Sequence, residues 1–261
     1  MWPFTHRPFL DPETADWQIE NTEWMVETFG AAGALFEGAA VLPNDETFPL
    51  AETSGHERAE RIFKIVRERA GLTDWPITLV PDSNPNAERP AYGTGIESSR
   101  HAVGMFMPSE DGVQISYATA LLDRPQQLVA TLAHELAHYL LMSVVDRPCA
   151  EPDEEEFLTD LAAVFLGFGV FVTNGRSFHE TIVTETGVGA GWGSAGYLPE
   201  NDLVFATALW ALIAGGSLAE IRTALKPHLR KPYDRSLAQL EGDERVARIR
   251  MMILDMRGAS S

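Results

Sequence analysis

The residues best suited to chemistry lie in the sequence HELAH, which contains His134, Glu135 and His138. Side chains four residues apart lie on one face of an α-helix, so the two histidines can direct their imidazoles at one point. Zinc binds neutral imidazole nitrogen, and Glu135 beside the first histidine can take a proton from a metal-bound water without itself being a ligand. The spacing therefore predicts a two-histidine zinc site with Glu135 as general base.

A catalytic zinc normally has three protein ligands and a water, so a third ligand is expected. The pattern HExxHxxGxxH fails because Leu141 and Val144 stand where it needs glycine and histidine. Glu156 follows 18 residues after His138, and Asp160 lies one helical turn further on. We predict that Glu156 is the third ligand and that Asp160 accepts a hydrogen bond from the ring N–H of a ligating histidine.

HELAH followed by ExxTD on the next predicted helix resembles the gluzincin class of zinc metallopeptidases, in particular the compact minigluzincins. The resemblance covers roughly residues 113–171. It implies Zn²⁺ as cofactor, a peptide or protein substrate, and an Asp160 that orients His134. It also implies that the strand before the active-site helix, here Val113–Tyr117, forms the rim of the cleft and binds extended substrate along its edge.

An oxyanion-stabilising group is the part of such a site that the sequence does not identify. Tyr139, His179 and Tyr197 are candidates, and their spacing favours none of them. The gap leaves open a rival hypothesis, a non-catalytic zinc-binding protein with a structural or interaction role. The rival predicts a closed fourth coordination position and unfolding on chelation, whereas a catalytic site should keep its fold. A third alternative is a pair of structural histidines with no metal.

Two other motifs are set aside. GWGSAG, at 191–196, satisfies GxGxxG, but no apolar strand precedes it and Pro199 interrupts the segment after it, so we expect a loop and no dinucleotide site. The single cysteine, Cys149, cannot form an internal disulfide and is interpreted as incidental.

Charge and hydropathy exclude several classes of partner. The chain of 261 residues has 38 acidic and 20 basic side chains, a formal charge of −18 that repels nucleic acid and anionic membranes. No apolar run approaches the roughly 20 residues needed to cross a bilayer, and residues 1–10 lack the features of a secretory signal. We expect a soluble cytoplasmic protein with no nucleic-acid or membrane partner; the oligomeric state stays open.

Apolar periodicity predicts an α+β protein with a small mixed sheet, an active-site helix, a glutamate helix and a largely helical C-terminal part, and the resemblance to gluzincins implies a zincin-like fold. Residues 14–36 fit a helix only loosely, so 1–50 is interpreted as an N-terminal accessory arm and 51–261 as the zincin-like domain. The expected strands are Ile77–Val80 and Val113–Tyr117, and the expected helices are 54–71, 125–145, 153–172, 203–213, 218–229 and 243–256.

Overall fold

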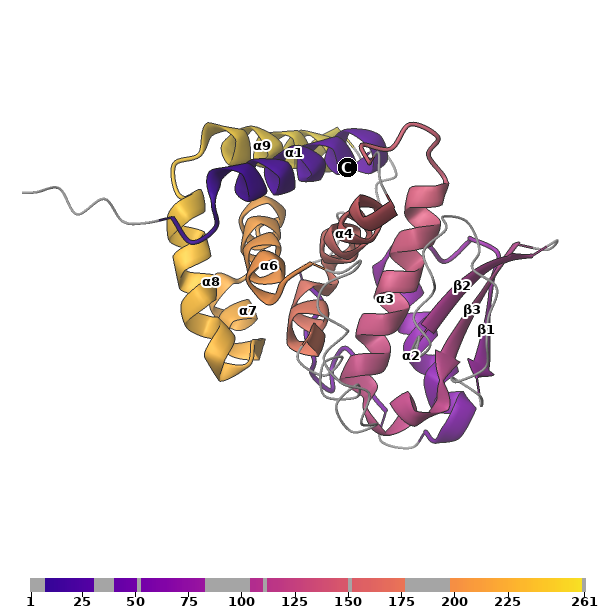
Figure 1. Ribbon diagram of the computed structural model, residues 1–261. Coiled ribbons are helices and arrows are strands. Elements are labelled where there is room, and N and C mark those ends of the chain that lie inside the picture. The colour runs from indigo at the N-terminus through magenta and orange to yellow at the C-terminus, as the bar shows by residue number, and fades with distance from the viewer. Residues whose placement is uncertain are drawn as a thin grey trace, which may run out of the picture.

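The computed structural model describes residues 8–30, 40–50, 53–82, 104–109, 112–149, 152–176 and 198–259. Its elements are α1 (Pro12–Phe29), α2 (Gly55–Arg69), β1 (Ile77–Asp82), β2 (Gly104–Ser109), β3 (Gly112–Ala118), η3 (Thr119–Asp123), α3 (Pro125–Met142), α4 (Pro152–Ala163), η4 (Val164–Phe168), α6 (Glu200–Ala214), α7 (Leu218–Ala224), α8 (Pro227–Leu240) and α9 (Glu244–Ala259). Figure 1 shows the sheet at one side, α2, α3 and α4 in the middle, and the helices α1, α6, α7, α8 and α9 at the other side. The predicted α+β class is confirmed at this level.

The sheet has the strand order β1-β3-β2. β1 runs parallel to β3 with Ile77 opposite Val113, and β2 runs antiparallel to β3 with Gly104 opposite Tyr117. Both predicted strands are therefore present and paired. β2 was not predicted, because GMFMPS contains a glycine and a proline that weaken a strand pattern. Since β3 is paired on both sides, the prediction that 113–117 offers an edge to a substrate is wrong.

Gly112 fixes the turn from β2 into β3. Its φ of +134° is one that side chains with a Cβ rarely adopt, and a Cβ there would overlap the carbonyl oxygen of Pro76. The same carbonyl accepts a hydrogen bond from Val113 N–H at 2.9 Å, so the chain before β1 and the start of β3 must lie in contact. Glycine is required here for both conformation and space.

We expect Gly112→Ala to lower the free energy of unfolding by more than about 2 kcal/mol, because backbone strain and a backbone clash add. Gly215→Ala is the control: Gly215 also has a positive φ, +74°, but has nothing within 4 Å of its Cβ position. Gly215→Ala should lower the free energy of unfolding by only about 1 kcal/mol. Urea unfolding of both variants measures the difference, and equal losses would contradict the clash with Pro76.

The helix α3 is buried on nearly all sides, and it packs against α2, α4, β2 and β3. It begins with Pro125, whose missing N–H costs nothing in a first turn, and it ends three residues earlier than predicted, at Met142. The helix α2 was predicted to within two residues, and Gly71, with φ +70°, follows its end. These two helices position HELAH beside the sheet.

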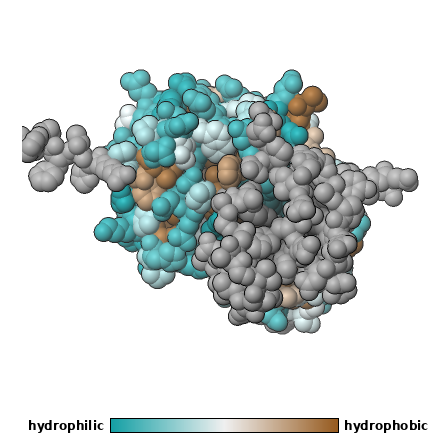
Figure 2. Space-filling model, viewed as in Figure 1, coloured by the Kyte–Doolittle hydropathy of each residue, from teal (hydrophilic) through white to brown (hydrophobic). Residues whose placement is uncertain are grey.

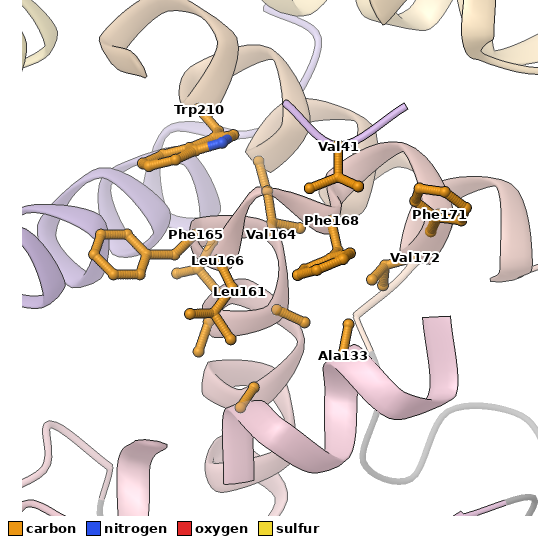
Figure 3. Close-up of a cluster of buried hydrophobic side chains, with 14 of the residues drawn as sticks. Val41, Ala133, Leu161, Val164, Phe165, Leu166, Phe168, Phe171, Val172 and Trp210 are labelled. Atoms are coloured by element: carbon orange, nitrogen blue, oxygen red, sulfur yellow. The ribbon is translucent and has the colours of Figure 1, made fainter. Parts of the chain in front are cut away.

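The predicted helix 153–172 is present but broken. α4 passes into a π-helical turn, η4, in which Gly167 has φ +96°, and the chain is helical again over 169–176. The carbonyl freed at the kink is satisfied, because Gly167 O accepts from Val41 N–H at 2.9 Å. Residues 154–176 have the length and composition of a membrane span, but 89% of their most apolar window is buried inside the protein. Figure 3 shows Phe165 and Phe168 of this segment in the core, and the ring centroid of Phe165 lies 5.4 Å from that of Trp210.

The C-terminal part is helical as predicted, with one correction. The predicted helix 218–229 is two helices, α7 and α8. Leu225 and Lys226 have extended backbone, with ψ of 145° and 147°, because a residue before proline is driven out of the helical region and Pro227 then starts α8. α6 is a buried helix that packs against α8 and α9.

The helix α1 lies along α9 (Figure 1). Arg245 pairs with Asp16 at 2.7 Å, and Arg248 pairs with Glu23 at 2.6 Å. Met25 of α1 is fully buried in the same hydrophobic core as the rest of the described chain. The division into an arm, 1–50, and a domain, 51–261, stays a prediction. Hydrophilic residues cover most of the described surface on the face that Figure 2 shows.

Candidate metal centre

Two packed helices supply the predicted site residues. α3 carries His134, Glu135 and His138, and α4 carries Glu156 and Asp160. The two helices pack against one another and are neighbours in Figure 1. Four-residue spacing on each helix places one pair of side chains opposite the other, so all five predicted residues fall in the same region of the protein.

Three of these side chains converge. Glu156 Oε2 lies 3.3 Å from His134 Nε2 and 3.6 Å from His138 Nε2, and the three potential ligand atoms all lie within 4.8 Å of one another. The two imidazole rings are nearly perpendicular, at 87°, with centroids 4.8 Å apart. The group can hold a metal ion, and it is the set that the sequence predicted.

The second nitrogen of each imidazole ring, Nδ1, lies within hydrogen-bond distance of a side chain of α4. His134 Nδ1 lies 2.9 Å from Asp160 Oδ1, which can only accept when ionised. His138 Nδ1 lies 3.3 Å from Thr159 Oγ1, whose own hydroxyl donates to Glu155 O at 2.7 Å. Both Nδ1 atoms therefore act as donors, and in the neutral rings this leaves the lone pairs on Nε2, the atoms that face Glu156.

Thr159 is the site residue that the sequence analysis missed. Its position three residues after Glu156, on the same face of α4, was the available signal. Asp160 was predicted as a histidine partner, but its second contact was not: Oδ2 accepts from the backbone N–H of Leu198 at 2.9 Å. Asp160 is only 3% exposed, so this pair of hydrogen bonds holds its carboxylate in one orientation.

The donor set, two imidazole nitrogens and a carboxylate oxygen, is of a kind that binds divalent metal ions such as zinc. Two ligands about 2.05 Å from a tetrahedral zinc are roughly 3.3 Å apart, close to the two histidine–glutamate distances above. Glu156 Oε2 is buried and has no hydrogen-bond partner in the described part of the chain. Its close contacts are the two histidine Nε2 atoms, and when these carry lone pairs a cation among the three ligand atoms would remove the cost of bringing them together.

Electrostatics at the site also favour a cation. Burial would lower the pKa of His134, but the hydrogen bond to Asp160 and the neighbouring Glu156 outweigh it and raise that pKa well above its ordinary value. Burial alone would raise the pKa of Glu156, but His134 and His138 hold it well below its usual range. The carboxylates of Glu156 and Asp160, which stabilise a proton on His134, would stabilise a metal cation held at the same place.

Glu135 lies in the same electrostatic environment. It is 7% exposed, and burial raises its pKa, while His134 and His138 act in the opposite direction. Glu156 nearby adds to the increase. A carboxyl group with a raised pKa is better matched to taking up and returning a proton near neutral pH.

Tyr139 and Cys149, which the sequence also singled out, are not among the converging side chains. Tyr139 packs edge to face on Trp75, with ring centroids 4.7 Å apart. His179, Tyr197 and the segment 191–196 lie outside the described residues. Cys149 is a free, partly buried thiol whose pKa is raised by burial.

No family model matches the chain, and no match was found among curated proteins or solved structures. The candidate metal centre therefore stands on the geometry of its own residues.

We expect Asp160→Asn to weaken zinc binding about 10- to 100-fold. Both carboxylate oxygens of Asp160 accept a hydrogen bond, whereas asparagine has one accepting oxygen, so either His134 or the Leu198 N–H loses its partner. Competition with a chromophoric chelator measures the affinity. Asp146→Asn, at an exposed position, is the control and should bind zinc like the parent. Unchanged affinity of Asp160→Asn would show that Asp160 does not support the ligand.

Proposed function

We propose that this chain is a zinc-dependent metallopeptidase that hydrolyses peptide bonds with a zinc-activated water. The observation that carries the proposal is the convergence of His134, His138 and Glu156 within 4.8 Å, with the buried Glu135 next to the first histidine. The order of these residues along the chain, HELAH on one helix and a glutamate on the next, resembles that of gluzincins. A zincin-like fold, with α2 and α3 packed beside a small mixed sheet, is part of the proposal.

Each residue has a defined task in this mechanism. Zinc, when bound, would lower the pKa of a coordinated water from about 15.7 toward 7 and polarise the scissile carbonyl. His134, His138 and Glu156 would hold the ion, and Asp160 and Thr159 keep the two rings in position through their Nδ1 atoms. Glu135 would accept the proton from the water and return it to the leaving amine.

The edge of the sheet offers a place for the substrate. Within the described residues β2 pairs on one side only, with β3, and α3 packs against it. An unpaired strand edge presents backbone N–H and C=O groups to which an extended peptide can add as a further strand. We therefore assign to β2 the role that the sequence analysis gave to Val113–Tyr117.

One observation favours the rival, a non-catalytic zinc protein. Tyr139, the only proposed oxyanion donor within the described residues, packs on Trp75. The non-catalytic hypothesis has the same metal ligands as the peptidase hypothesis but gives the metal a structural role. Removing the metal therefore distinguishes the two hypotheses.

Removing the metal is the experiment that tests the proposal. We expect one zinc per chain, cleavage in a broad peptide library, and loss of that cleavage in excess chelator with the circular-dichroism spectrum largely retained. Added zinc should restore cleavage. Zinc binding without cleavage, together with unfolding on chelation, would establish the structural role, and absence of zinc would leave the paired-histidine alternative.

A further inference from the structure

A cavity of about 660 Å³ lies at the beginning of α2 and α3, beneath the segment 43–50. Its wall is largely apolar and includes Phe48, Val129 and Phe171, of which Phe48 and Phe171 pack edge to face with ring centroids 5.4 Å apart. Its volume lies within the range of small-molecule binding sites, roughly 300 to 1,000 Å³. Short apolar molecules would fit by size.

The cavity is separate from the metal centre. Val129 and His134 are five residues apart on α3, a rotation of roughly 140° at about 100° per residue, so they point from different sides of the helix. None of the three metal-ligand candidates lines the cavity. A ligand bound here would contact neither the zinc nor Glu135.

Charged groups of both signs line the same cavity. Arg58 is held in place because its Nε donates to Thr53 O at 2.8 Å and its Nη1 contacts Leu122 O at 3.4 Å. A guanidinium has five N–H donors, so the remaining donors of Arg58 are available to a ligand. Arg61 is exposed, and neither arginine forms an ion pair with Asp45 in the described part of the chain.

The start of α3 adds to the positive side. Pro125 and Gln126 line the cavity, and Arg124 at the N-cap provides no side-chain hydrogen bond to the first turn. The N-terminal end of a helix carries a partial positive charge. The cavity thus combines a positive region at Arg58 and Arg61, a carboxylate at Asp45, and an apolar wall.

We propose that this cavity binds short apolar peptides with free ends, such as dipeptides. The terminal carboxylate would lie at Arg58 and Arg61, the terminal amino group at Asp45, and the apolar side chains against Phe48 and Phe171. Asp45 and the chain's formal charge of −18 disfavour polyanions such as nucleotides. This site depends neither on zinc nor on peptide hydrolysis.

The test is isothermal titration of the full chain with leucyl-phenylalanine in excess EDTA, so that the probe cannot bind a metal. Its C-terminal amide and its N-acetyl form each remove one charge. We expect saturable binding of the free dipeptide and about tenfold weaker binding of each blocked form. Arg61→Gln should weaken binding of the free dipeptide about tenfold. The Asp45→Asn variant has lost the partner of the amino group, so it should bind the N-acetyl form as well as the free dipeptide.

Arg69→Gln is the matched control, because Arg69 lies exposed on the same helix outside the cavity lining. It should bind like the parent. No saturable binding up to roughly 10 mM, equal binding by Arg61→Gln and the parent, or equal binding of the blocked and free dipeptides would each overturn the proposal. Zinc content and library cleavage of the same variants are measured separately, so failure here leaves the peptidase proposal intact.

Discussion

Replacing Glu135 with glutamine is expected to reduce peptide hydrolysis by about 10²- to 10⁴-fold while one zinc per chain stays bound. Glutamine has nearly the same size and shape but cannot take up a proton. Because Glu135 is buried, the substitution also removes an ionisable group from a site that penalises charge, so the fold should not suffer. Initial rates on the best library peptide, with metal analysis of the same sample, measure both quantities.

A glutamate on an exposed surface provides the control for Glu135. Glu57→Gln changes an exposed glutamate in the first turn of α2 and should leave both rate and zinc content at the parent level. If Glu135→Gln binds zinc and cleaves as fast as the parent, Glu135 is not the base. If neither protein cleaves, the metal centre remains but the enzyme hypothesis is lost.

Replacing His138 with alanine is expected to weaken zinc binding by at least about 10²-fold and to abolish chelator-sensitive hydrolysis. Only His134 and Glu156 would remain as protein ligands, and two ligands do not make a stable zinc site. His138 is preferred to His134 for this test because His134 is hydrogen-bonded to the buried Asp160, and its removal would strand a carboxylate. The corresponding partner of His138 is the hydroxyl of Thr159, and leaving this neutral group without its histidine partner costs less than leaving a buried carboxylate without one.

Zinc titration of the His138→Ala variant is compared with that of the control His228→Ala. His228 is an exposed histidine that pairs with Glu200 and is not one of the proposed ligands. The control should keep the parent affinity. Stoichiometric tight binding by His138→Ala would mean that the three converging side chains are not the zinc ligands.

The local part of the site was predictable from the sequence. The spacing of His134 and His138 fixes their common face once a helix is expected, and the same argument pairs Glu156 with Asp160. The strand before α3 and the positions of α2, α3 and α4 followed from apolar periodicity and from glycine and proline at the ends. These features depend on residues within a few turns of one another.

Contacts between distant segments were not predictable. The pairing of β2 with β3 makes β3 the central strand, and the weak pattern of Gly104–Ser109 gave no sign of it. The Asp160 bond to Leu198 N–H and the Val41 bond to Gly167 O each join backbone to a partner 38 or more residues away. Every residue offers a backbone C=O, and every residue except proline a backbone N–H, so the sequence does not reveal which of them will meet.

The packing of α1 against α9 sets an order for folding during synthesis. Gln239 Oε1 accepts from the N–H of Leu10 across 229 residues, and Arg245 and Arg248 reach back to α1. Because α1 is synthesised long before α9, these contacts form late, and such late, long-range contacts slow folding. A chain that ends before residue 244 would carry the whole metal centre. The face of α1 that meets α9 would then be exposed to chaperones and proteases.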